Sequence, residues 1–305
     1  MGRASQSLAA GIALSRVVQN FLTQTTPGCA AVRNAITVDV EEYFQVAAFE
    51  RTIEREGWAT TPSRVAVSTA RILDLFASRG VSGTFFVLGW VAERHPALVR
   101  RIVDDGHELA SHGYDHTRVD RLSPEAFRSD VVRTKAILEN LVGVRVRGYR
   151  APSYSINGGN LWALDVLQET GHVYSSSVYP IQHDLYGMPE APRTPFRVRA
   201  EGILEIPVTT VALLGRNLPC GGGGYFRLLP YPLFRWALKR VNKKECHAGM
   251  FYFHPWELDP DQPRVHAAPL KSRFRHYLNL GVMEERLGRL LNDFSWDRMD
   301  RVFGV

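Results

Sequence analysis

The sequence contains little cysteine and no long uninterrupted run of apolar residues. Its three cysteines, Cys29, Cys220 and Cys246, lie far apart, and none belongs to a CxxC pair. So sparse a set supports neither a disulfide framework nor a thiolate metal site, and it fits a reducing compartment. No apolar run approaches the ~20 residues that a membrane-spanning helix requires. These absences exclude a disulfide-rich scaffold and predict a protein without stable membrane insertion.

A basic run interleaved with aromatic residues is also missing, although the formal net charge is +6. Proteins that bind nucleic acid concentrate such residues on one face, whereas the arginines here are scattered along the chain. We therefore interpret the excess charge as a solvated surface and predict no nucleic-acid partner. With 45% hydrophobic and 22% charged residues, the composition is that of a globular protein. A chain of 305 residues is long enough for one large domain or two ordinary ones.

Residues 1–33 lack the features of a clean export signal. Arg16 interrupts a weak apolar stretch, and no small-residue cleavage site follows an apolar core. We predict a poorly ordered N-terminal extension, with a degenerate export signal as the open alternative. The absence of a clean signal predicts a cytoplasmic location.

Short β-rich runs alternate with segments of helical spacing through most of the chain. The β-rich runs lie at 36–40, 83–89, 107–111, 146–150, 172–177, 203–208 and 250–254. Helical spacing of apolar residues occurs at 65–76, at 91–103 and after Ser123, where a cap residue precedes a proline. Such alternation predicts a parallel sheet with helical crossovers. Roughly seven units predict a (β/α) barrel, incomplete or distorted.

The alternation loosens from Pro192 onward. Prolines and the run Gly221–Gly224 interrupt it, and helical spacing returns at 233–241 and 283–291. Because the last β-rich run lies inside this looser part, we predict that residues 192–305 complete the barrel within one domain, 34–305. The glycine run lacks the Lys-Ser/Thr of a phosphate-binding loop, so we predict a flexible loop near a substrate groove.

Polar side chains stand at the carboxyl ends of four predicted strands. They are Asp39, Glu41, His112, His116, Arg150 and His254. In barrels and open α/β sheets, functional side chains gather at the carboxyl ends of the parallel strands. Two carboxylates, three histidines and an arginine are therefore expected on one face, as one site.

A metal site is the first interpretation of this set. The spacing His112-x-x-x-His116 suits a divalent ion that takes nitrogen ligands, although such a pair alone is more often a surface feature. A carboxylate would complete a two-histidine, one-carboxylate set. Asp39 and Glu41 point to the same side of an extended strand, whereas Glu42 points to the other. We assign Glu41 to the metal and place Asp39 beside it.

The remaining residues suit acid–base catalysis. Arg150 beside Asp39 would keep that carboxylate ionised and oriented, as a general base requires, and a structural salt bridge is the alternative. A histidine in an apolar run such as FYFHPWE is usually a satisfied core residue. The position of His254 at the end of the last strand, opposite the proposed base, makes it a candidate general acid.

Five segments together resemble the polysaccharide deacetylase family, the NodB-homology or carbohydrate esterase family 4 group. They read TVDVEEYF, GTFFVLGWVAERHP, HELASHGYDH, YRAPSYSI and YFHPWE. The closer resemblance is to a branch associated with exosortase and exopolysaccharide gene clusters, which has an extra C-terminal region. That region is carried by LEIPVTT, PCGGGGYFRLLPYPLFRWAL, HPWELDPDQPRV and SRFRHYLNL. The resemblance extends from Arg33 to the end and implies a distorted (β/α)7–8 barrel of the NodB-homology type.

The resemblance also implies roles for individual residues. Asp39 would be the catalytic base, held by Arg150, and His254 the acid that protonates the leaving amine. His112 and His116 would bind a divalent metal, zinc by default, with Glu41 as the third ligand. The expected substrate is a polysaccharide or oligosaccharide. An association with exopolysaccharide assembly machinery is also expected. The candidate substrate contacts are Pro152, Tyr154 with its neighbouring backbone N–H as an oxyanion donor, and Trp256.

Two departures from the family pattern leave alternatives open. Val40 stands where the family has its metal-binding aspartate, which motivates a metal-independent amidohydrolase on the same barrel. Ser175 stands where the family has an aspartate that pairs with the acid histidine. That change motivates a catalytically silent carbohydrate-binding protein of a polysaccharide assembly system. The two histidines of the metal set oppose the first alternative, and the base, arginine and acid together oppose the second.

Overall fold

A computed structural model describes residues 32–184 and 186–305 of the chain. The predicted disorder of residues 1–33 falls almost entirely outside this part. The main sheet has eight parallel strands in the order β10-β1-β2-β3-β4-β5-β6, and β9 pairs with β1. Its strands are β1 (Arg33–Val40), β2 (Thr84–Val87), β3 (Glu108–Ser111), β4 (Gly148–Tyr149), β5 (Tyr174–Ser175), β6 (Leu204–Glu205), β9 (Met250–Phe253) and β10 (Ser295–Asp297). The predicted distorted barrel of parallel strands is confirmed.

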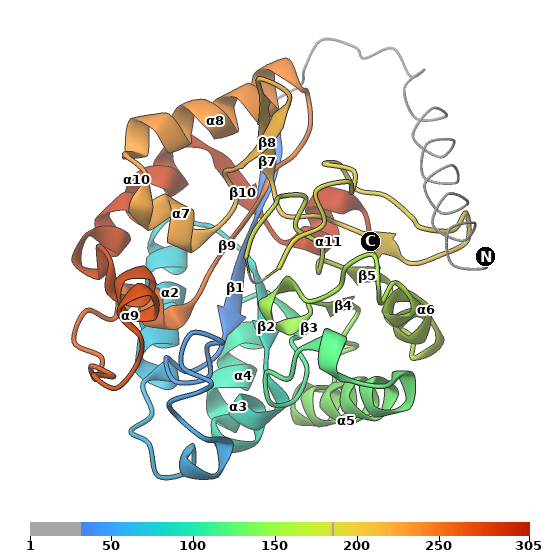
Figure 1. The fold of residues 1–305 in the computed structure, drawn as a ribbon, viewed down its shortest axis with the longest axis vertical. Coiled ribbons are helices and arrows are strands. Elements are labelled where there is room, and N and C mark those ends of the chain that lie inside the picture. The colour runs from blue at the N-terminus through green and yellow to red at the C-terminus, as the bar shows by residue number, and fades with distance from the viewer. Residues whose placement is uncertain (1–31, 185) are drawn as a thin grey trace.

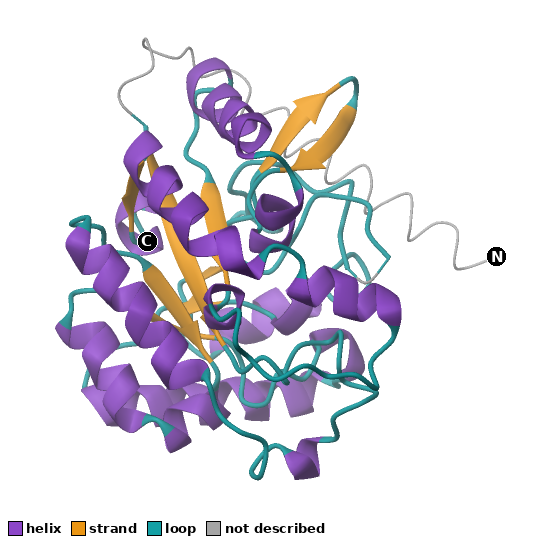
Figure 2. Ribbon diagram, turned by 90° about the vertical axis from the view of Figure 1, so that its left-hand side faces the viewer, coloured by secondary structure: helices purple, strands orange, loops and turns teal. Residues whose placement is uncertain are grey.

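Helices surround this sheet, as Figures 1 and 2 show. They are α2 (Val65–Ser78), α3 (Gly89–Arg94), α4 (Pro96–Asp104), α5 (Pro124–Val142), α6 (Trp162–Glu169), α7 (Gly223–Leu228), α8 (Tyr231–Lys244), α9 (Leu270–Tyr277), α10 (Met283–Asp293) and α11 (Met299–Phe303). Seven of the eight residues of β1 are buried, as expected for a parallel strand covered on both faces. Within the described part of the chain, no helix combines the length and apolarity needed to cross a bilayer.

Local sequence accounts for where several helices begin and end. The side chain of Ser123 accepts a hydrogen bond from the backbone N–H of Ala126 and caps α5 as predicted. The predicted helical segment 91–103 is divided into α3 and α4 at His95, because Pro96 lacks an N–H and disfavours helical geometry in the preceding residue.

The C-terminal part contributes strands next to the first one. β9 pairs with residues 35–38 of β1 and β10 with residues 33–35. The sequence pattern did not predict β10, nor the antiparallel hairpin of β7 (Thr210–Leu213) and β8 (Arg216–Pro219), because both are short and follow the proline-interrupted part.

The glycine run is not the flexible loop that its composition predicted. Gly222 forms a parallel bridge with Tyr252, and Gly223 begins α7. A Cβ atom at Gly223 would lie 2.3 Å from a carboxylate oxygen of Glu257. Glycine is required here because a helix and a strand end approach each other closely.

Candidate active site

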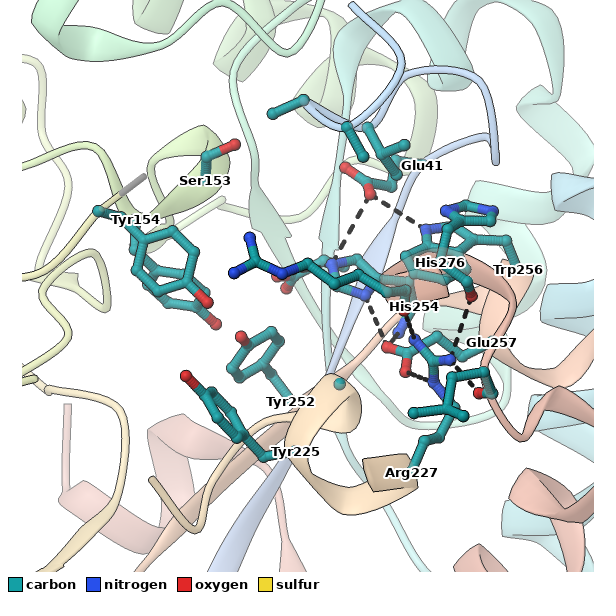
Figure 3. A pocket seen from close by; sticks show the side chains of 18 of the residues that line it. Glu41, Ser153, Tyr154, Tyr225, Arg227, Tyr252, His254, Trp256, Glu257 and His276 are labelled. Atoms are coloured by element: carbon teal, nitrogen blue, oxygen red, sulfur yellow. Dashed lines mark hydrogen bonds and ion pairs between the residues drawn. The ribbon is translucent and has the colours of Figure 1, made fainter. Parts of the chain in front are cut away.

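The predicted residues converge at the carboxyl ends of the parallel strands. Asp39 is in β1 and Glu41 follows it, His112 and His116 follow β3, Arg150 follows β4, and His254 follows β9. All six line or adjoin one region, where the side chains of Asp39, Glu41 and His112 are each 2% exposed. Figure 3 shows Glu41 and His254 facing the same space. The convergence expected from strand order is therefore present.

Glu41, His112 and His116 form a cluster whose ligand atoms lie within 4.8 Å of one another. The Oε2 atom of Glu41 lies 2.9 Å from Nε2 of His116 and 3.9 Å from Nε2 of His112. The Nδ1 atom of His112 lies 2.8 Å from the carbonyl oxygen of Arg150. This contact fixes the tautomer with the proton on Nδ1, so Nε2 presents its lone pair to the cluster.

Neighbouring Glu42 does not belong to this cluster. Its carboxylate accepts hydrogen bonds from the backbone N–H groups of Arg64 and Val65, at the beginning of α2. The alternation of an extended strand therefore separates the two adjacent glutamates as predicted.

The electrostatics of the cluster fit a bound cation. Burial alone would raise the pKa of Glu41, but His116, His254 and His112 lower it to about 2. Burial lowers the pKa of His112 to about 4, so this imidazole is neutral at pH 7, the form that binds metals. The Oε2 atom of Glu41 is buried and has no hydrogen bond of good geometry within residues 32–184 and 186–305. Two imidazoles and one carboxylate form a ligand set suited to a divalent ion.

Asp39 is held by a buried arginine. One guanidinium nitrogen of Arg150 donates to Oδ1 of Asp39 at 2.5 Å and to the hydroxyl of Thr37 at 2.8 Å. The rest of the guanidinium donates to the carbonyl and hydroxyl oxygens of Ser176 and lies 3.9 Å above the ring of Phe86. Because one oxygen of Asp39 is engaged by the arginine, the other carboxylate oxygen, Oδ2, faces His254.

His254 lies opposite this carboxylate, with its side chain 19% exposed. Its Nε2 atom is 4.0 Å from Oδ2 of Asp39 and 3.7 Å from Oε1 of Glu41. Its Nδ1 atom is 2.8 Å from Oε1 of Glu257. Burial would lower the pKa of His254, but Glu41, Glu257 and Asp39 raise it to about 9. One imidazole nitrogen therefore faces the cavity while a carboxylate holds the other.

Glu257 is a residue that the sequence reasoning missed. The spacing His254-x-x-Glu257 was visible, and it places the glutamate in the first turn of the 3-10 helix Pro255–Leu258. Its carboxylate also accepts from Nε of Arg227 at 2.7 Å, and neither side chain of this pair is more than 2% exposed. Burial would raise the pKa of Glu257, but Arg227 and His254 lower it, so the group is ionised.

Arg227 lies in α7, the helix that begins within the glycine run, and it is anchored by backbone oxygens. Its guanidinium donates to the carbonyl groups of Arg275, His276 and Leu278 at the end of α9. Ser175, where the resemblance implies an aspartate, donates to the hydroxyl of Ser177 at 2.8 Å. The carboxylate that contacts His254 is thus that of Glu257, which Arg227 holds in place. Ser175 makes no such contact with His254.

Trp256 lines the cavity, and histidines cover both faces of its ring. Its ring is stacked between the rings of His254, at 5.0 Å and 18°, and His276, at 4.1 Å and 14°. Its Nε1–H donates to Oε1 of Glu41 at 3.2 Å. The indole N–H thus orients the proposed metal ligand, and a contact between Trp256 and a substrate stays a prediction.

The turn at Pro152–Tyr154 differs in part from its predicted role. The Tyr154 side chain lines the cavity, but Pro152 is buried and is not among the lining residues. The backbone N–H of Tyr154 donates to the carbonyl oxygen of Ala151 at 3.0 Å. This N–H is engaged within the turn, and the predicted oxyanion contact from a backbone N–H near Tyr154 stays a prediction.

These residues surround a cavity of about 340 Å³. Its lining residues include Asp39, Glu41, His112, His116, Tyr154, Tyr186, Tyr225, Arg227, Tyr252, His254, Phe274 and Arg275. Tyrosines form one wall, and Figure 3 shows Tyr154, Tyr225 and Tyr252 on the side opposite Trp256. A concave, largely apolar site with a few convergent polar groups is the usual form of a ligand-binding site.

Two family models match successive parts of the chain. Residues 58–174 match the model described as "Polysaccharide deacetylase". Residues 176–304 match the model described as "Domain of unknown function (DUF3473)". The first match contains both histidines of the candidate metal cluster, and the second contains His254, Glu257 and Arg227.

Individual relatives match shorter stretches. A peptidoglycan-N-acetylglucosamine deacetylase of Bacillus cereus is 34% identical over 98 residues, covering 32% of this chain and 36% of that protein. A chitooligosaccharide deacetylase of Sinorhizobium fredii is 33% identical over 114 residues, covering 37% of this chain and 50% of that protein. The chain therefore spans half or less of the length of these relatives.

A solved structure shows the same fold over most of the chain. It is that of a Mycobacterium smegmatis protein assigned to the polysaccharide deacetylases, with a TM-score of 0.59 and 20% sequence identity. The match covers 92% of this chain and 91% of that chain. This similarity supports the barrel architecture.

Proposed function

Because the chain contains a polysaccharide deacetylase domain, we propose that it is a metal-dependent hydrolase that removes N-acetyl groups from amino sugars of a polysaccharide. The observation that carries this proposal is the arrangement of three functions around one cavity. A metal-ligand cluster, an arginine-held carboxylate and a carboxylate-held histidine all face it. Metal-assisted amide hydrolysis uses an ion that polarises the carbonyl group, a base that takes a proton from water and an acid that protonates the leaving nitrogen.

Glu41, His112 and His116 would hold the metal, with zinc as the default because imidazole nitrogens and a carboxylate oxygen suit it. A divalent ion of this kind polarises a carbonyl group and lowers the pKa of a water molecule towards ~7. The Nδ1 contact of His112 and the indole contact of Glu41 would hold two of the ligands in orientation.

Asp39 is the proposed base. Its Oδ2 atom accepts a proton from the attacking water, while Oδ1 remains bound to Arg150. The arginine fixes the orientation of the carboxylate before the reaction, which general-base catalysis requires.

His254 is the proposed acid. When the bond between the acetyl carbon and the sugar nitrogen breaks, Nε2 gives its proton to the departing nitrogen, leaving acetate and a free amine. Glu257 accepts from Nδ1 and keeps Nε2 directed into the cavity. Arg227 holds Glu257 in turn, so the acid is oriented by residues of the C-terminal part.

The choice of an exopolysaccharide as the polymer, and an association with its assembly machinery, rest on the resemblance of the C-terminal motifs. The relatives named for peptidoglycan and chitooligosaccharide deacetylation support an N-acetylated glycan as the substrate class. The metal-ligand cluster opposes a metal-independent amidohydrolase, and the arranged base and acid oppose a silent binding protein. The single-domain extent 34–305 and the cytoplasmic location stay predictions.

The proposal is tested by acetate release from N-acetylated oligosaccharides. We expect activity that disappears with a chelator, returns with added zinc and is absent in His112→Ala. Acetate release that is insensitive to a chelator would favour the metal-independent enzyme. Zinc binding without acetate release from any N-acetylated glycan would favour the silent binding protein.

A further inference from the structure

The excess positive charge of the chain arises in one segment. Of the 37 lysine and arginine residues, seven lie within residues 206–244, a stretch that contains none of the 31 aspartate and glutamate residues. The remainder of the chain therefore has one more acidic than basic residue, and the formal net charge of +6 comes from this segment alone. Charge of one sign that is concentrated in this way gives part of a surface a positive potential.

This segment forms the hairpin of β7 and β8, followed by α7 and α8. Val211 of β7 belongs to the same buried cluster as Phe234 and Leu238 of α8, so the hairpin and the helix pack together. Figures 1 and 2 show them side by side at one end of the molecule, and Figure 1 shows that β1 begins at this end. The proposed base, Asp39, lies at the other end of β1. The hairpin and α8 are therefore separate from the catalytic residues at the carboxyl ends of the strands.

The helix α8 has one face toward the protein and one face toward solvent. Phe234, Ala237, Leu238 and Val241 are buried and recur at helical spacing on the inner face. The outer face carries Leu233, Trp236, Lys239, Arg240, Lys243 and Lys244. Its two apolar residues, Leu233 and Trp236, are 47% and 43% exposed. The outer face thus joins exposed apolar side chains in the first turns to basic side chains in the last ones.

The tip of the neighbouring hairpin carries a leucine that packing does not explain. Leu214 is 94% exposed, and its φ of 49° lies in the left-handed region. Gly215 follows with a φ of 73°. A two-residue turn with two positive φ values favours asparagine or glycine, because the left-handed backbone is costly for other residues. A large apolar side chain that is both strained and exposed indicates contact with another molecule.

Basic side chains around these apolar residues lack acidic partners. Arg216, Lys239 and Lys244 form no ion pair within residues 32–184 and 186–305, whereas Arg235 pairs with Asp293. The helix dipole accounts for basic residues in the last turn of α8, but not for the exposed leucine and tryptophan beside them. An anionic bilayer matches both features, since its headgroups attract basic side chains and its acyl boundary accepts apolar ones. A nucleic acid would match only the charge.

We propose that the hairpin tip and the outer face of α8 form a peripheral binding surface for an anionic phospholipid bilayer. Leu214 and Trp236 enter the boundary between headgroups and acyl chains, while the basic side chains contact the lipid phosphates. Because Asp39 lies at the other end of β1, docking of this kind leaves the catalytic cavity accessible to a glycan. This inference does not depend on the proposed deacetylase function.

The test measures co-sedimentation of the full chain with vesicles of phosphatidylcholine alone and of phosphatidylcholine with phosphatidylglycerol in equal parts. We expect binding to the anionic vesicles only, and weaker binding as the salt concentration rises. The combined variant Arg216→Gln, Lys239→Gln and Lys244→Gln should lower the partition coefficient about 100-fold, because each basic residue contributes about fivefold. The matched control removes three exposed charges outside the segment, with Arg51→Gln, Arg100→Gln and Arg145→Gln, and should bind nearly as the wild type does.

Leu214→Ser tests the apolar contribution. It should lower the partition coefficient roughly tenfold, whereas Leu270→Ser, at a position that is 78% exposed on α9, should leave it unchanged. Absence of binding to anionic vesicles at low salt would overturn the proposal. An equal loss in the charge control would also overturn it, because net charge and not this surface would then be responsible. Tight binding to duplex DNA, with vesicle binding that Leu214→Ser does not change, would show a general polyanion site instead of a lipid surface.

Discussion

The N-terminal and C-terminal parts of the chain contribute to one cavity in different ways. Residues up to 174 supply the metal-ligand cluster, Asp39 and Arg150 from the ends of strands β1, β3 and β4. Residues after 176 supply His254 from the end of β9, together with a network of side chains behind it. In the first part, the ends of three strands place the functional side chains. In the second part, one strand end places His254, and a 3-10 helix and an arginine of α7 hold it.

This difference indicates that the C-terminal region is part of the proposed active site. Arg227 connects α7 to the carbonyl groups at the end of α9 and to Glu257. The stacked rings of His254, Trp256 and His276 connect the same region to Glu41. A region of unknown function thereby acquires a role, which is to hold the proposed acid and one proposed metal ligand.

The largest effect is expected in the N-terminal part. Asp39→Asn removes the proposed base but keeps its shape, and we expect kcat to fall about 10²- to 10⁴-fold. Acetate release by the purified variant measures this, with circular dichroism to establish folding. Asp74→Asn, at an exposed position paired with Arg101, is the control and should retain full activity. A variant Asp39→Asn with unchanged kcat would exclude Asp39 as the base.

A smaller but definite effect is expected in the C-terminal network. Glu257→Gln weakens the contact that orients His254, and we expect kcat to fall about 10- to 100-fold with little change in KM. Arg227 then lacks its buried counter-charge, so the free energy of unfolding should fall by about 3 kcal/mol. Activity measured well below the melting temperature separates the two effects. If kcat is unchanged at that temperature, the pairing of Glu257 with Arg227 is only structural. The C-terminal part would then not orient the proposed acid.

The link between the two parts can be tested by Trp256→Phe. This change removes the indole donor to Glu41 and keeps an aromatic ring between the two histidines. We expect zinc affinity to fall about tenfold, because outer contacts orient metal ligands. Zinc titration of the apoprotein measures it. An unchanged affinity would show that the indole contact does not support the metal ligand.

The opposite end of the sheet should affect stability alone. Glu108 begins β3, away from the site, and accepts hydrogen bonds from Thr84 and Tyr174. Burial, with Asp300 as a further cause, raises the pKa of Glu108 from 4.5 to about 7. The folded state therefore binds more protons than the unfolded state between these values, and stability falls as the pH rises through that window.

The glutamine of Glu108→Gln does not titrate. The melting temperature of this variant minus that of the wild type should therefore increase from pH 5 to pH 8. The corresponding change in the free energy of unfolding is about 2 kcal/mol, and kcat should stay at the wild-type value. A difference in melting temperature that is the same at both pH values would contradict the raised pKa. A fall in kcat would contradict the separation of the two ends of the sheet.

The sequence predicted the N-terminal half of the site because strand periodicity determines it. Alternation placed Asp39 and Glu41 on one side of β1 and Glu42 on the other, and the structure confirms this. Strand order then brought His112 and Arg150 to the same edge of the sheet. Such positions follow from local geometry, which a single sequence contains.

The C-terminal half was less predictable because it depends on contacts between distant segments. Glu257 was visible three residues after His254, but its pairing with Arg227 spans 30 residues. The glycine run was interpreted as a flexible loop, since nothing local shows that Gly223 packs against Glu257. The stacking of Trp256 on His276 was not predictable either, because His276 belongs to a separate helix, α9.

The most direct test of the account compares zinc binding and acetate release in His112→Ala and His254→Ala. We expect His112→Ala to lose both, whereas His254→Ala should bind zinc with the wild-type stoichiometry and release no acetate. Because Nε2 of His254 lies only 3.7 Å from Oε1 of Glu41, the main alternative is that His254 is itself a metal ligand. Loss of zinc binding in His254→Ala, or full activity without that imidazole, would contradict the assignment of the acid to the C-terminal region.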